Sequence, residues 1–300
     1  MTALIEIASP ATGGRPRKGA GGRPRKGAGG RWGWLLLPSL VLLAVLFLVP
    51  LGLMAWRSVS EPTPGAANYS WFFTSDVALA TLVRTLTVGA VVTLVTLVLS
   101  YPYAYLMTVV GARARIWLTL LVLLPFWTSL MVRTFAWVVL LQDSGVVNQI
   151  LGTVGLGPLQ LIRTPTGVVI GMSQVLMPFM VLPLYAVMSG IDRRLLDAAQ
   201  GMGARPAIAF LRVFVPLSLP GVGAGALTVF ITSLGFYVTP ALLGSPDQAL
   251  ISQQIFTQVN GLLAWGRGGA MGVVLLAVTL VLLGLVGVVL RLTRGRGGAR

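Results

Sequence analysis

Few residues of this chain are of the types that do chemistry. It has seven acidic side chains, no histidine and no cysteine. The absence of histidine and cysteine excludes thiol nucleophiles and the usual ligand sets that hold zinc or haem. The seven carboxylates leave little for acid–base catalysis, because none of them lies at the centre of an apolar run. We therefore expect a protein that is not an enzyme, with no catalytic residue, no metal site and no cofactor in this chain.

The densest group of unusual residues is "LLDAAQGMGARPAIAFLRVFVPLSLP", residues 195–220. This stretch lies between two long apolar runs, yet it carries an acid, two arginines, adjacent alanines, glycines and prolines. Leu195, Ala199 and Met202 recur at spacings of four and three, which places them on one face of a helix. A loop that only joins two apolar segments needs none of these features, so we expect this stretch to have a task of its own.

A turn and a second helix are expected after this first helix. Gly201 and Gly203 permit a sharp change of direction. Pro206 suits the first turn of a helix, because its missing N–H would have no partner there. We predict two short helices that meet at a glycine, with Ala198 and Ala199 forming a flat surface that another protein can approach closely.

The elements that position this stretch are membrane spans. Hydrophobic residues make up 56% of the chain and charged residues only 10%, whereas soluble domains are about 25% charged. Apolar runs of about 20 residues recur, each long enough to cross a bilayer, and they are continuous rather than alternating, which excludes a β-barrel. We predict an all-α membrane protein with six transmembrane helices. The expected spans are about 34–56, 79–107, 116–140, 167–190, 217–242 and 270–290.

The basic residues predict the orientation of the spans. The net charge is +15, and most of the 22 basic residues gather in the two termini and in the loops after the second and fourth spans. This is the positive-inside pattern with both termini cytoplasmic. The charge therefore reflects topology and contact with membrane lipid, and we expect no nucleic-acid partner.

Three regions follow from this division. Residues 1–33 are expected to be a disordered basic cytoplasmic tail, which repeats "GGRPRKGA" and either attracts anionic lipid or only fixes the orientation. Residues 34–291 form the transmembrane domain, with the loop 192–216 on the cytoplasmic side. Residues 292–300 form a second cytoplasmic tail.

One sequence signature in this loop resembles a known family. The pattern E-A-A-x3-G-x9-I-x-L-P is typical of the permease subunits of ABC importers, and every spacing of it fits here, with Asp replacing Glu and Val replacing Ile and Leu. Further likeness, in "LLPFWTSLMVRTFAWVVLL", "GVVNQIL" and "GFYVTPALLG", points to the spermidine/putrescine branch and covers most of residues 35–290. The matching positions are Asp197, Ala198, Ala199, Gly203, Val213, Val215 and Pro216.

The resemblance implies the type I ABC importer permease fold in a bacterial inner membrane, crossed several times. It also implies that the seven matching residues dock a separate cytoplasmic ATPase dimer, which would hold the ATP and magnesium. This chain has no Walker A loop of its own, because its only lysines, Lys18 and Lys26, are each followed by glycine. A second homologous permease would complete the translocation path, and a periplasmic or lipid-anchored solute-binding protein would deliver the solute.

Candidate path residues are few. Arg133 is the one charge expected inside a span, where charge is a default indication of function. It would line the path, pair with an acid of a neighbouring subunit, or extend to the membrane interface, and it would repel a polyamine if it faced one. The other candidates are Gln174, Tyr237 and Thr239.

Other functions remain as alternatives. Ferric-iron and small-anion permeases share parts of the resemblance, so either could replace the polyamine as the cargo. A secondary transporter not driven by ATP would use intramembrane acids or an inverted repeat, and neither is evident in the sequence. A membrane scaffold would not need the docking loop.

Overall fold

The computed structural model describes residues 29–297, with side chains described over 37–287, and within this range the chain is helical with no strand. Most of the predicted tail 1–33, and residues 298–300 of the second tail, lie outside the described residues. The elements are α1 (Gly29–Ser60), α2 (Ala67–Thr74), α3 (Asp76–Val109), α4 (Ala112–Trp127), α5 (Leu130–Leu141), α6 (Val146–Thr153), α7 (Pro165–Met188), α8 (Arg194–Gly201), α9 (Pro206–Ala209), η1 (Phe210–Phe214), α10 (Val215–Leu234), α11 (Val238–Leu243), η2 (Pro246–Gln248), α12 (Ile251–Phe256), η3 (Thr257–Gly261) and α13 (Trp265–Gly297).

Six stretches of the described residues are long and apolar enough to cross a membrane, which confirms the predicted all-α membrane fold. The chain divides into two units, residues 1–50 and 51–300. In the first unit, every side chain from Leu37 to Pro50 is exposed. All the packing described below belongs to the second unit.

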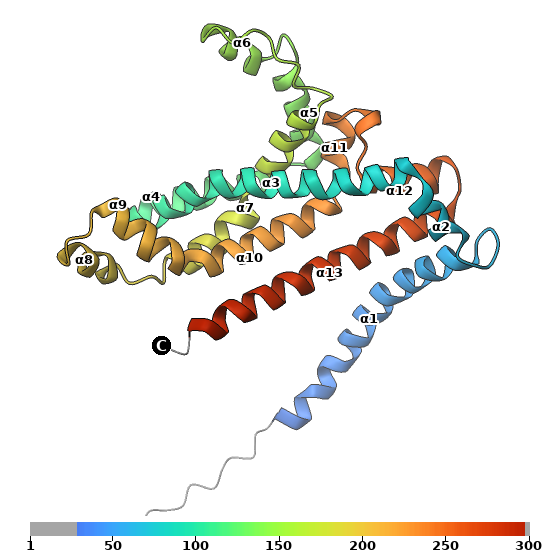
Figure 1. Ribbon diagram of the computed structural model, residues 1–300, viewed down its shortest axis with the longest axis horizontal. Helices are drawn as coiled ribbons and strands as arrows, with labels where there is room; N and C mark the ends of the chain where they lie inside the picture. The colour runs from blue at the N-terminus through green and yellow to red at the C-terminus, as the bar shows by residue number, and fades with distance from the viewer. Residues whose placement is uncertain (1–28, 298–300) are drawn as a thin grey trace, which may run out of the picture. The chain divides into compact units, whose positions relative to one another are not determined.

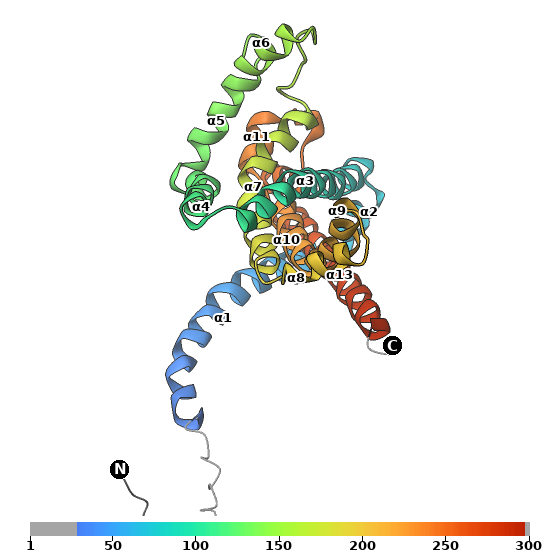
Figure 2. The ribbon, with the colours of Figure 1, turned by 90° about the vertical axis from the view of Figure 1, so that its left-hand side faces the viewer.

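Helices α3, α7 and α10 form the core of the second unit and lie side by side in both views (Figures 1 and 2). Helix α7 is the most buried of the candidate spans. Its Met172, Leu176, Met180 and Leu184 recur every four residues and are fully buried, so they form one continuous seam toward the neighbouring helices.

Small residues set the spacing between α7 and α10. A Cβ atom added at Gly221 would lie 3.0 Å from Cβ of Val187 and 3.1 Å from the carbonyl oxygen of Pro183. One added at Gly225 would lie 2.7 Å from Sδ of Met180. The helix backbones therefore approach as closely as glycine allows, which is how membrane helices gain dispersion contacts without a hydrophobic driving force.

The predicted span 116–140 is wrong as a single helix, because α4 ends at Trp127 and α5 begins at Leu130. Thr128 between them is extended, with φ −96° and ψ 142°. Both N and Oγ1 of Thr128 donate to the carbonyl oxygen of Pro125, at 3.3 and 2.9 Å. Hydropathy alone cannot detect this break, because apolar residues continue across it.

The predicted span 217–242 is displaced toward the C-terminus. The helix that overlaps it begins at Pro206, continues through η1 and α10, and ends at Leu234, and α11 is a separate short helix. The last span begins at Trp265 rather than near 270, because the sequence "GRGGAMG" is helical despite its glycines. Glycine lowers helix propensity, so the sequence alone places this start too late.

Exchange of glycine for alanine at two neighbouring positions tests the α7–α10 contact. We expect Gly221→Ala to lower the free energy of unfolding by about 1–3 kcal/mol, because the added methyl overlaps backbone atoms of α7. Gly223→Ala is the matched control, since nothing lies within 4 Å of its added Cβ. Thermal unfolding in detergent measures both, and equal midpoints for the two variants would contradict the close contact.

Candidate functional site

The predicted docking stretch folds as α8 followed by the continuous helix from Pro206 (Figure 1). Asp192 lies just before α8, where its Oδ1 accepts a hydrogen bond from the backbone N of Arg194 at 2.9 Å and satisfies a donor left free at the helix start. Pro206 occupies the first turn of the second helix, as predicted. The sequence therefore gives the right secondary structure for this stretch.

Gly203 forms the turn between the two helices. Its φ is +91°, a conformation that L side chains rarely adopt. The N–H of Gly203 donates to the carbonyl of Gln200 at 2.9 Å, and the N–H of Ala204 donates to that of Ala199 at 3.1 Å. These two bonds are the Schellman motif, which satisfies the last carbonyls of α8 and fixes the exit direction of the chain.

Helix α8 has no fully buried residue, and its inner face packs on the core through the half-buried Leu196. Asp197 and Ala198 are exposed, and Ala199 is half-buried. Two apolar side chains near the ends of α8 are also exposed to solvent, Leu195 by 47% and Met202 by 84%. The outer face of this helix, with its alanine, its carboxylate and its exposed apolar side chains, is suited to docking.

Two arginines, one from this region and one from α4, bind the carbonyls at the end of α3. Nη2 of Arg193, just before α8, donates to the carbonyl oxygen of Thr108 at 2.7 Å. Arg115 of α4 donates to the carbonyls of Met107 and Val110 at 3.1 and 3.2 Å. The last carbonyls of a helix lack intrahelical partners, so these guanidinium groups bind where acceptors are free.

Aromatic rings make the second tie, between η1 and α3. The rings of Phe210 and Phe214 are stacked with centroids 5.3 Å apart, and Tyr105 meets both edge-on, at 5.1 and 5.2 Å. Tyr101 of α3 also contacts Phe210, and its hydroxyl lies 2.9 Å from that of Ser218. Sequence reasoning missed this cluster, although Phe and Tyr at spacings of four on both segments signal it.

The remaining signature residues lie where η1 joins α10. Val213 and Val215 are half-buried, and Pro216 is exposed. The N–H of Val215 donates to the carbonyl of Phe210 five residues earlier, which makes this a π-helical turn. The wider turn relieves the crowding that the ring of Pro216 would impose on the carbonyl of Arg212, so the helix continues through the proline.

Two of the candidate path residues lie near the break between α4 and α5. Arg133 donates from Nη1 to the carbonyl oxygen of Pro125, the acceptor that Thr128 also uses. Gln174 accepts from Nε1 of Trp137 at 3.4 Å. Gln174 and Pro125 line a cavity of about 220 Å³ with Tyr103 and Met177.

The other two candidates lie after the end of α10. Thr239 is buried, 3.5 Å from Oγ1 of Thr134 in α5, and packs on Gly171 of α7. Tyr237 lies apart from the other three, with its ring 5.1 Å from that of Phe256. Arg133 of α5 and Thr239 of α11 thus lie on helices that pack against α7, which carries Gln174. A path role for all four residues stays a prediction.

Comparisons with known proteins agree with this arrangement. Residues 100–294 match the family model described as binding-protein-dependent transport system inner membrane component. The chain is 33% identical over 199 residues to the spermidine/putrescine transport system permease protein PotB of Escherichia coli (strain K12), covering 66% of this chain and 72% of the relative. It is 32% identical over 242 residues to the PotB of Haemophilus influenzae, covering 79% and 82%.

One solved structure shares the fold. It is the bacterial alginate ABC transporter in complex with an alginate pentasaccharide-bound periplasmic protein, which superposes with a TM-score of 0.69 at 20% identity. The superposition covers 85% of this chain and 93% of that chain.

Substitution of the turn glycine tests the geometry of the docking stretch. Gly203→Ala places a side chain at φ +91°, and we expect a local cost of about 1–2 kcal/mol. The amides of residues 203 and 204 should then exchange hydrogen roughly 5–30-fold faster. Gly201→Ala, inside α8 and without a positive φ, is the control and should not raise exchange. Unchanged exchange in Gly203→Ala would contradict the Schellman turn.

Proposed function

Because the chain belongs to the family of binding-protein-dependent transport system inner membrane components, we propose that its α8–α10 segment is driven by a separate ATPase and that its cargo is a polyamine. The protein is a multi-pass inner membrane permease subunit of an ABC importer, of the polyamine branch. The driving partner, the pairing of subunits and the cargo are the proposed parts.

The observation that carries the ATPase proposal is an exposed docking helix with stiff connections to the core. Helix α8 has no buried residue, yet Arg193 binds it to α3 and the turn at Gly203 joins it to the helix that becomes α10. Helices α3 and α10 both pack on α7. A displacement of α8 would therefore move the three core helices with it as a rigid body. Rigid-body movements of this kind switch proteins between two states.

Asp197, Ala198 and Ala199 have distinct roles in this proposal. The alanines permit close approach of the ATPase surface, and the carboxylate pairs with a donor there, because no described residue hydrogen-bonds to it. Gly203 holds the turn, and Val213, Val215 and Pro216 carry the movement into α10. ATP and magnesium would be bound by the ATPase dimer, and this chain would need no cofactor. Both termini and α8 would then be cytoplasmic.

A second homologous permease is proposed to complete the path. Helices α4 and α5 expose large apolar side chains, among them Trp117 at 73% and Val132 at 66%. These helices also carry the break at Thr128 and the Arg133 side chain, next to the cavity at Gln174. A partner permease on this face would enclose the path. A periplasmic or lipid-anchored solute-binding protein would deliver the solute, as a periplasmic protein is bound to the alginate transporter.

The polyamine proposal rests on the two PotB relatives, whose names state spermidine and putrescine transport. A small anion is the second candidate, because Arg133 is a cation inside the membrane domain. In this structure the guanidinium of Arg133 is engaged by the carbonyl of Pro125 at the end of α4, which gives it a structural task. That task favours the polyamine as the cargo.

Exchange of the docking acid tests the ATPase proposal. We expect Asp197→Arg to abolish uptake while leaving thermal unfolding unchanged, because the side chain is exposed and its carboxylate makes no hydrogen bond or ion pair within the described residues. Asp197→Glu should retain uptake, since it keeps the carboxylate on the same helix face. Uptake by right-side-out vesicles measures both variants, and wild-type uptake by Asp197→Arg would refute the docking role.

Uptake of labelled solutes tests the cargo. Cells that lack the gene should lose uptake of labelled putrescine or spermidine, and the wild-type gene should restore it. Sulfate and ferric iron serve as comparison solutes under the same conditions. Loss of uptake of one of these, with polyamine uptake intact, would replace the polyamine as the cargo without affecting the docking of the ATPase.

A further inference from the structure

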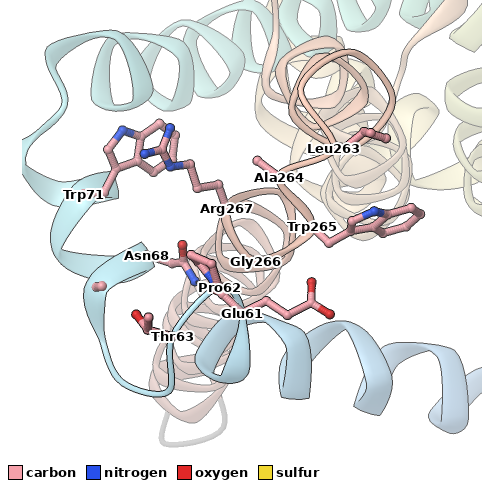
Figure 3. Close-up of a pocket in the computed structure, with 11 residues that line it drawn as sticks. Glu61, Pro62, Thr63, Asn68, Trp71, Leu263, Ala264, Trp265, Gly266 and Arg267 are labelled. Atoms are coloured by element: carbon pink, nitrogen blue, oxygen red, sulfur yellow. Dashed lines mark hydrogen bonds between the residues drawn. The ribbon is translucent and has the colours of Figure 1, made fainter.

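A pocket of about 580 Å³ lies where the end of α1, the start of α2 and the start of α13 meet (Figure 3). Its polar and aromatic lining comes from Glu61, Thr63, Asn68, Trp71, Trp265 and Arg267. One candidate membrane span ends at Ser60 and another begins at Trp265. The pocket therefore lies at the boundary between hydrocarbon and water, where tryptophan and arginine are the common interfacial residues.

Glycines make this pocket a rigid part of the structure. A Cβ atom added at Gly266 would overlap the carbonyl oxygen of Glu61, and one added at Gly269 would lie 2.7 Å from that of Met54. The backbone of α13 thus lies directly against the end of α1. The walls of the pocket are set by this contact rather than by flexible side chains.

Asn68 leaves an unused hydrogen-bond acceptor in the pocket. Its side chain is only 4% exposed, and its Nδ2 donates to the carbonyls of Ser58 and Glu61 at 2.9 and 2.6 Å. These two bonds fix the orientation of the amide, and no described donor meets Oδ1. Figure 3 shows this oxygen turned toward the side where Arg267 lies. Asn68 lines the open pocket, so this unpaired oxygen is accessible to an N–H or O–H group of a ligand.

Arg267 leaves an unneutralised cation beside this acceptor. Its guanidinium lies 4.8 Å from the ring centroid of Trp71, and no carboxylate of the described residues pairs with it. Arg57 offers a contrast: it lies 4.8 Å from the ring of Trp265 but also pairs with Glu61 at 3.7 Å. The free charge of Arg267 favours an anionic group and disfavours a cationic polyamine.

We propose that this pocket binds the headgroup of a phospholipid. The phosphodiester pairs with Arg267, and a donor on the headgroup, the ammonium of ethanolamine or a hydroxyl of glycerol, meets Oδ1 of Asn68. The acyl chains lie along the apolar residues of α13 and of the end of α1, residues 51–59. The pocket lies at the depth of the phosphate layer, so a lipid reaches it without leaving the membrane. Phosphatidylcholine has the phosphate but no N–H or O–H donor, so it pairs only with Arg267.

A headgroup series on the wild-type protein tests this proposal. The intact transporter is delipidated and titrated with phosphatidylethanolamine, phosphatidylglycerol and phosphatidylcholine of identical acyl chains, and native mass spectrometry measures the bound lipid. We expect the first two to bind about tenfold more tightly than phosphatidylcholine, because only they satisfy Asn68. Equal affinity for all three, or preference for phosphatidylcholine, would overturn the proposal.

Two arginine variants locate the site. Arg267→Gln should lower the affinity for all three lipids about tenfold, whereas Arg113→Gln removes the same charge from the first turn of α4 and should leave it unchanged. An equal effect of both variants would show a general charge effect and overturn the assignment. The headgroup series does not depend on the folding of either variant.

Free inorganic phosphate is the other ligand that would bring a phosphate group to Arg267. Inorganic phosphate, added to the wild-type complex with phosphatidylethanolamine, should not displace the lipid, because it gains nothing from the apolar helices. Displacement at low millimolar phosphate would identify an ion site and reject the lipid.

Discussion

A backbone carbonyl inside a membrane needs a donor from the protein, because hydrocarbon supplies none. Continuous helices meet this requirement internally, and every break creates carbonyls that do not. At the end of α4, the carbonyl of Pro125 accepts hydrogen bonds from Thr128 and Arg133. At the end of α3, the carbonyls of Met107 and Val110 accept hydrogen bonds from Arg115, and that of Thr108 accepts one from Arg193. The positions of the breaks thus determine where several arginines must lie.

This constraint gives those arginines a second role beside orientation. Basic residues near helix ends follow the positive-inside pattern, yet Arg115 also holds α4 against α3, and Arg193 holds the start of α8 against α3. If a partner docks on α8 as proposed, its movement and the satisfaction of the α3 backbone depend on the same Arg193 side chain.

The sequence predicts which stretches are helical, but it does not predict where one helix ends and the next begins. Six spans and the helix–glycine–helix stretch were predictable, because hydropathy and the αL preference of Gly203 are local properties. The break at Thr128 was not, since its stability comes from Arg133, five residues further on. The continuation through Pro216 was also missed, because it depends on a π turn packed on Tyr105. The pocket at Asn68 joins the neighbouring ends of α1 and α2 to the start of α13, which is far from them in the chain.

The π turn at Phe210–Phe214 accommodates one residue more than an α-helical turn would. Each residue of an α-helix advances the chain by about 100° around the axis. A relative that lacks one residue here would therefore present its docking helix in a different direction around α10. If α8 docks on an ATPase as proposed, insertions and deletions at this position should be accompanied by changes in the ATPase surface that receives it.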